Sequence, residues 1–194
     1  MSEILFSTSN PEKTLIAKTI CSAKGLNVEQ ISLDIDEIQG EDPKVIAEDK
    51  VRKAYQKIKK AVVVSDDSWD IPALNGFPGP YMKSLNHWFK AEDFLRLMDG
   101  INDRTVLIHQ YLSYFDGKNI YTFKNDFSGK VTLEPRGKND RSPSTMITEL
   151  DIDNGKTIAE LFEEVEQGAL INRYLTNNDV WHEFVTWYLK TKRA

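Results

Sequence analysis

Short apolar runs alternate with longer segments of helical spacing through the first third of the chain. The runs at 3–7, 27–33 and 61–65 predict strands, and the last is typical of a strand that is buried on both faces. The segments 11–23 and 43–60 place apolar residues three and four positions apart, as amphipathic helices do. This alternating order indicates an α/β layer with parallel strand pairing.

The middle of the chain changes to a β-rich pattern. Val106–Phe115 and Asn119–Lys124 surround the turn Phe115-Asp-Gly-Lys118, which predicts a β-hairpin. Further helices are expected at 91–98, 157–166 and 178–190, and a further strand at 129–134. The last helix carries one apolar face, made by Val180, Trp181, Phe184, Val185 and Tyr188. Such a stripe is more typical of a core or dimer contact than of a cofactor site.

Composition narrows the class of protein. The chain has 194 residues, 40% of them hydrophobic and 28% charged, which describes one ordinary globular domain. A net charge of -5 argues against a nucleic-acid-binding surface. No apolar run is long enough to span a membrane, and no signal peptide is recognisable. The single Cys21 cannot form an internal disulfide, so we expect a buried, inert thiol and a cytoplasmic protein.

The most informative chemistry follows the third predicted strand. Asp66 and Asp67 stand at its expected carboxyl end, which is where open α/β sheets place their ligands. The following Gly-Phe-Pro-Gly-Pro segment is too rich in turn residues to continue a strand or a helix. Paired carboxylates beside a shaped loop suit a divalent cation that also holds phosphate oxygens.

A second candidate lies after the first strand. Ser9 or Asn10 is suited to cap a helix, Pro11 fits its first position, and Lys13 lies in its first turn. The N–H groups and the positive dipole at a helix start bind anions, and Lys13 adds a full charge. A capped helix without a ligand explains the same residues. No Gly-x-x-x-x-Gly-Lys is present, so this is not a Walker A loop. The three histidines, His87, His109 and His182, show no metal-ligand spacing and are expected to be structural or exposed.

These segments resemble the inosine triphosphate pyrophosphatase family, whose members remove aberrant purine nucleoside triphosphates. Thr8–Lys13 is similar to its phosphate loop, and Ile35–Glu41 to the segment with its first acidic metal ligand. The stretches Ser65–Ser68 and Ala73–Lys83 resemble its most diagnostic part, and Glu134–Gly137 the end of a family strand. The segments follow the family's order along the chain.

The resemblance implies a fold and a set of site residues. The expected fold is an elongated mixed α/β sheet flanked by helices, with two lobes around a central cleft, formed by residues 1–194 as a single domain. The implied cofactor is Mg²⁺, held by Glu37 and Asp67. The implied catalytic residues are Asp66, Asp67 and Lys13, and Asp66 or Asp67 would activate the attacking water. The implied substrate-binding residues are Ser9, Asn10, Lys13, Lys50 and Arg173. Homodimers are usual in the family, and the last helix or the 77–90 region offers an interface.

The residues that contact the purine base in the family are replaced by other residue types in this sequence. The expected stacking aromatic aligns with Arg141 and an expected Asp with Ser144. The family's Ser-His-Arg appears here as Ile171-Asn172-Arg173, and a preceding Lys falls at Gln167. Arg141 is able to stack on a base through its guanidinium plane, or it is merely an exposed loop residue. We expect Arg141 and Asn172 to influence base choice if a nucleotide binds.

Three functions remain open from the sequence. The first is a nucleoside triphosphate pyrophosphatase that yields a monophosphate and pyrophosphate, acting on non-standard purines such as ITP and XTP or with a changed base preference. The second is a nucleotide-binding protein that has lost turnover. The third is hydrolysis of another phosphate ester, as in the related Maf-type pyrophosphatases.

Overall fold

The computed structural model describes residues 3–164 and 179–193. The chain divides into two compact units. The first unit comprises residues 1–66, 110–125 and 174–194, and the second comprises residues 67–109 and 126–173. Strands β3, β5 and β6 contribute residues to both units. The expectation of a single domain around a cleft stays a prediction.

The strands form a seven-stranded mixed sheet. Its order is β2-β1-β3-β5-β6-β7, with β4 paired to β3. β1 pairs in parallel with β2 and β3, whereas the β3–β4 and β6–β7 pairs are antiparallel. The strands are β1 (Glu3–Ser7), β2 (Asn27–Ile31), β3 (Val62–Asp70), β4 (Pro78–Gly79), β5 (Thr105–Phe115), β6 (Ile120–Val131) and β7 (Thr148–Leu150). The predicted class, a mixed α/β sheet with helices, is confirmed.

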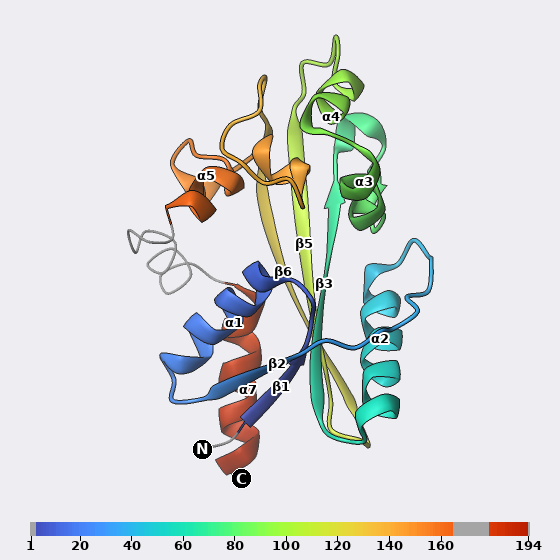
Figure 1. Ribbon diagram of the computed structural model, residues 1–194, viewed down its shortest axis with the longest axis vertical. Helices are drawn as coiled ribbons and strands as arrows, with labels where there is room; N and C mark the ends of the chain where they lie inside the picture. The colour runs from blue at the N-terminus through green and yellow to red at the C-terminus, as the bar shows by residue number, and fades with distance from the viewer. Residues whose placement is uncertain (1–2, 165–178, 194) are drawn as a thin grey trace. The chain divides into compact units, whose positions relative to one another are not determined.

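In the first unit, helices lie on both faces of the sheet (Figure 1). Helices α1 (Pro11–Ser22) and α7 (Val180–Arg193) lie on one side, and α2 (Pro43–Ile58) lies on the other. On the α2 side, Val51 and Ala54 form one apolar cluster with Val62 and Val64 of β3. These α2 residues belong to the predicted apolar face, so burial of that face positions the helix.

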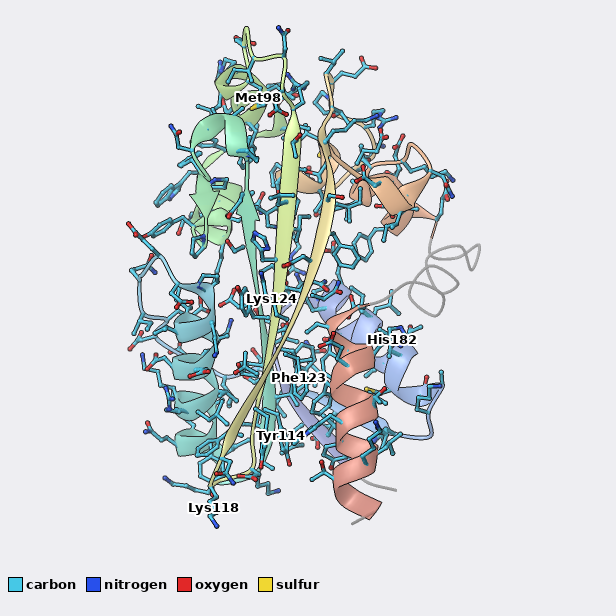
Figure 2. The ribbon with its side chains drawn as sticks, turned by 180° about the vertical axis from the view of Figure 1, so that it is seen from behind. Met98, Tyr114, Lys118, Phe123, Lys124 and His182 are labelled. Atoms are coloured by element: carbon cyan, nitrogen blue, oxygen red, sulfur yellow. The ribbon has the colours of Figure 1, made fainter. Side chains whose placement is uncertain are left out.

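The aromatic stripe of α7 lies in the core of the first unit. Phe184 is fully buried, and its ring lies 5.7 Å from Tyr114 and 5.8 Å from Phe123. Figure 2 shows these two labelled residues on the strands beside α7. Trp181 packs edge-on against Phe6 of β1 at 4.9 Å. The core interpretation is therefore confirmed, and this face is not available as a dimer contact.

The second unit surrounds a separate core that includes Trp69, Met82, Phe94 and Met98. Within its described residues, the α-helices are α3 (Met82–Trp88), α4 (Ala91–Leu97) and α5 (Ile158–Glu163). The sequence analysis did not predict α3, because the turn residues before it suggested a loop. It was also wrong in dividing β6, since this strand continues to Val131 and includes the start of the expected 129–134 strand.

The third strand is longer than predicted. β3 runs to Asp70, so Asp66 and Asp67 lie inside the strand and not after its end. The extension is stabilised by β4, which pairs Trp69 with Gly79 and Asp70 with Pro78. The apolar pattern stops at Val64, and polar residues hid the continuation, because pairing with β4 is a tertiary contact.

The β5–β6 hairpin is confirmed. The carboxylate of Asp116 accepts hydrogen bonds from the backbone N–H groups of Lys118 and Asn119, at 2.7 and 2.6 Å. Gly117 takes the positive φ of 98° that the turn requires. Within residues 3–164 and 179–193, no helix combines the length and the hydrophobicity needed to cross a membrane.

Candidate functional site

A lysine ammonium lies between two carboxylates in the first unit. Nζ of Lys50 is 3.0 Å from Oε1 of Glu37 and 3.8 Å from Oδ2 of Asp66. The three side chains are only 17%, 22% and 24% exposed, respectively. The structure therefore brings together three of the residues that the sequence analysis selected, from a loop, a helix and a strand. A solvated position for Lys50 on its helix is excluded.

Helix α2 places Lys50 at the edge of its buried face. Asp42 caps the helix by accepting hydrogen bonds from the N–H groups of Lys44 and Val45, at 2.9 and 3.4 Å. Lys50 follows Ala47 by three residues and precedes Ala54 by four, and both alanines are fully buried. Residues at this spacing share one side of a helix. The ammonium of Lys50 is thereby directed to the β3 side.

The segment that carries Glu37 is attached along α2 by lysines. Nζ of Lys53 donates to the carbonyl of Asp36 at 2.6 Å, and Nζ of Lys57 donates to the carbonyl of Asp34. Leu33 and Ile35 pack against the same apolar cluster as α2. The segment has no regular secondary structure, so these two kinds of contact hold Glu37 beside Lys50.

Asp66 and Asp67 point to opposite sides of β3. Successive side chains of a strand alternate between its faces, so Asp66 shares the face of Val62 and Val64. That face packs on α2, which explains the approach to Lys50. Asp67 belongs to the other face. The carboxylate that the structure brings to a shared cation with Glu37 is thus Asp66, whereas Glu37 with Asp67 stays a prediction.

The expected phosphate loop is a capped helix start. Oδ1 of Asn10 accepts from the N–H groups of Glu12 and Lys13, at 2.8 and 3.3 Å. Asn10, and not Ser9, is the cap, and Ser9 is exposed. Since this side chain already binds two N–H groups of the first turn, an anion here would interact with the charge of Lys13 and the helix dipole.

A charged cluster that the sequence analysis missed lies in the second unit. Nδ1 of His109 is 2.6 Å from Asp126, and Nε2 is 3.4 Å from Asp70. Ser68 donates a hydrogen bond to Asp70 at 3.2 Å. The histidine connects side chains of β3 and β6 through β5. No sequence spacing could reveal the cluster, because its members come from three different strands.

The predicted base-side residues are only partly described. Arg141 is exposed, in accord with its loop position. Ser144, at the place of an expected family Asp, is 1% exposed, and its Oγ has no hydrogen-bond partner. Its backbone N–H donates to Oδ1 of Asn86 at 3.0 Å. Gln167, Asn172 and Arg173 lie outside the described residues.

The Glu134–Gly137 motif has a structural role in the second unit. The guanidinium of Arg136 donates to Glu149 at 2.9 Å and to the carbonyl of Gly155 at 3.0 Å. The carbonyl of Arg136 accepts from the hydroxyl of Thr157, which caps α5. Lys130 adds a second cation to Glu149 at 2.9 Å, and hydrogen bonds from Lys130 and then Arg136 hold the pKa of this carboxyl below its usual range.

The donor set near Lys50 fits a divalent cation that shares its coordination with a substrate. Within the described parts of the chain, no group of three or more His, Cys, Asp or Glu side chains is arranged to hold a metal. Glu37 and Asp66 nevertheless share one cation, the Lys50 ammonium. Two carboxylates with the remaining positions left to phosphates and water is the pattern that Mg²⁺ favours.

Several known proteins are similar to this chain in sequence or in structure. The model of the Ham1 family matches residues 4–170. The dITP/XTP pyrophosphatase of Methanopyrus kandleri is 33% identical over 137 residues, covering 70% of this chain and 73% of that protein. The dITP/XTP pyrophosphatase of Thermococcus kodakarensis is 26% identical over 184 residues, covering 95% and 96% of the two chains. The structure of a HAM1 protein from Coxiella burnetii covers 98% of this chain and 100% of its own, with a TM-score of 0.75 and 21% identity.

Proposed function

Because the chain belongs to the Ham1 family, we propose that it is a nucleoside triphosphate pyrophosphatase for non-standard purine nucleotides. Deoxyinosine and xanthosine triphosphates are the candidate substrates, in view of the names of its relatives. The products are the nucleoside monophosphate and pyrophosphate. The observation within the structure that carries the proposal is the partly buried Glu37–Lys50–Asp66 cluster, whose charges suit a metal–triphosphate complex.

Each residue of the proposed site has a chemical task. Lys13 and Lys50, with Arg173, hold the phosphate oxygens, which are anionic along the whole triphosphate. Glu37 and Asp66 hold the Mg²⁺, which when bound would neutralise phosphate charge and polarise the phosphorus under attack. Asp66 and Asp67 are the two candidate bases that would accept a proton from the attacking water, as the resemblance to the family implies. Ser9 and Asn10 form the loop before α1, and the phosphates bind beside this loop.

The base end distinguishes this chain from the family pattern. Arg141 and Ser144 occupy the positions of a stacking aromatic and an Asp, and Asn172 replaces a His. These changes support an altered ranking among bases, with Arg141 and Asn172 as the residues that contact the base. They also support a second candidate, a protein that binds nucleotides without hydrolysing them.

We further propose a homodimer that forms through the 77–90 region and functions in the cytoplasm. Phe77, Tyr81 and Trp88 in this region are 41%, 39% and 71% exposed. Large apolar side chains exposed together are typical of interaction surfaces. Light scattering of the wild type and of Trp88→Arg tests the dimer, since a 22.3 kDa mass for the wild type removes it.

A nucleotide panel tests the activity. The full chain is incubated with Mg²⁺ and the triphosphates of inosine, deoxyinosine, xanthosine and the standard bases, and released pyrophosphate is measured. We expect hydrolysis of at least one non-standard purine, abolished by chelating the metal. Binding in calorimetry without any pyrophosphate would establish the second candidate instead. Phosphate release without pyrophosphate would indicate cleavage between the β- and γ-phosphorus atoms instead, and no release from any of these nucleotides would favour a different phosphate ester as substrate.

A further inference from the structure

Lys50 lies where a metal ion would neutralise Glu37 and Asp66. Its ammonium is 3.0 Å from one carboxylate and 3.8 Å from the other. A divalent cation and an ammonium repel each other, so both cannot occupy the space between the same two carboxylates. One of them must leave when the other binds.

We propose that Lys50 is the resident counter-ion of the Glu37–Asp66 pair, so that a divalent cation binds there tightly only together with a triphosphate. This inference rests on the proposed function of the site. The triphosphate supplies the negative charge to which Lys50 moves, and the carboxylates are then released for the metal. Metal and nucleotide binding are therefore coupled through one side chain, and the free enzyme has low affinity for the metal.

Lysine is suited to be the moving part. Its ammonium is a compact charge on a flexible four-carbon stem, so a small rotation carries it to a new partner. The two carboxylates are held more firmly. Asp66 lies inside β3, and the segment of Glu37 is attached to α2 through the contacts of Lys53 and Lys57.

The charges predict the effect of removing the lysine. Glu37 and Asp66 each carry a negative charge, and the Lys50 ammonium places one positive charge beside both of them. Lys50→Met removes that positive charge, so the pair should bind a free divalent cation more strongly. Lys44→Met is the matched control, because Lys44 lies on the same helix and pairs with Glu48 at 3.9 Å. It removes an equal charge without touching the Glu37–Asp66 pair.

Paramagnetic resonance of Mn²⁺ measures the metal affinity directly. Without nucleotide, we expect Lys50→Met to bind Mn²⁺ at least about tenfold more tightly than the wild type, and Lys44→Met to remain within about twofold. With the α,β-methylene analogue of inosine triphosphate, wild-type affinity for Mn²⁺ should rise about tenfold or more. In Lys50→Met this nucleotide effect should fall to about threefold or less, after correction for Mn²⁺ bound by the nucleotide alone.

Three results would overturn the inference. They are an unchanged Mn²⁺ affinity in Lys50→Met, an equal gain in Lys44→Met, and a nucleotide effect that survives in Lys50→Met. Lys50→Gln, which keeps most of the stem, replaces the methionine variant if the latter does not fold. Turnover is measured separately on the wild type. A wild type without pyrophosphate release refutes the proposed function, while the Mn²⁺ measurements still decide the role of Lys50.

Discussion

Asp66 and Asp67 are adjacent in the chain but lie on opposite faces of one strand. Both are inside β3, where side chains alternate. Asp66 shares the α2 face and approaches Lys50 at 3.8 Å, while Asp67 faces the other way. Two adjacent carboxylates in a loop would be equivalent candidates for metal binding or for water activation. Two adjacent carboxylates in a strand contact different neighbours.

Substitution of Asp66 and substitution of Asp67 should change the kinetics of the enzyme in different ways. Asp66→Asn should raise the Mg²⁺ concentration needed for half-maximal activity, because it removes one of the two carboxylates proposed to hold the metal. Asp67→Asn should lower kcat by about 10²–10⁴-fold at saturating Mg²⁺, the usual loss for a general base. Steady-state kinetics over a range of Mg²⁺ concentrations distinguishes them. If the two variants exchange these behaviours, the metal pair is Glu37 with Asp67.

The residues at the base end should change substrate choice more than the overall rate. Arg141→Ala and Asn172→Ala should each alter kcat/KM ratios among nucleotides by about 1–3 kcal/mol, the cost of leaving a polar partner unmatched. Lys138→Ala is the control, since Lys138 is also exposed in the same loop. Relative rates that stay the same in both variants would show that base choice is made elsewhere.

Gly137 should be a steric requirement of the second unit. A Cβ at this position would meet the backbone of α5, at 2.7 Å from N of Glu160 and 2.9 Å from C of Ala159. Gly137→Ala should therefore lower the free energy of unfolding by more than Gly100→Ala. The control has a similar positive φ, 75° against 73°, but open space around it, so strain at φ is common to both. Equal losses in chemical denaturation would remove the packing explanation.

Glu149 should give a pH-dependent contribution to stability. Lys130 and Arg136 lower its pKa in the folded protein from 4.5, so its charged form stabilises the fold. This contribution is fully present above the unfolded pKa and is lost as the pH falls through the folded pKa. Glu149→Gln should therefore be less stable than the wild type near neutral pH, with a difference that shrinks in acid. Denaturant unfolding across this range measures it, and a difference that does not change with pH contradicts the ion-pair explanation.

Cys21 should be unreactive in the folded protein. Its side chain is fully buried, and burial raises the thiol pKa to about 12. At about pH 8 the thiolate fraction is then on the order of one in ten thousand, and only the thiolate reacts. A thiol reagent should label the protein at the rate of unfolding, and addition of denaturant should make labelling immediate. Fast labelling of the native protein would mean that the site opens.

The sequence alone determined the class of fold, most of its elements and the family. Apolar periodicity depends on local spacing, so it located β1, α1, α2, the β5–β6 hairpin and α7. The caps were also local, since Asn10 and Asp42 each bind N–H groups two and three residues ahead. The apolar run before Asp66 indicates a ligand site, whereas the selection of Glu37 and Lys50 follows only from the resemblance to the family.

Only the tertiary structure decided how these groups are arranged. β3 continues past Val64 because it pairs with β4, and this pairing sets Asp66 and Asp67 on opposite faces. Lys50 reaches Glu37 and Asp66 because α2 buries its apolar face on β3, which joins side chains far apart in the sequence. The His109 cluster likewise needs three strands in register. Sequence patterns record which face of an element is buried, but the partner of each charged group is set by packing between elements.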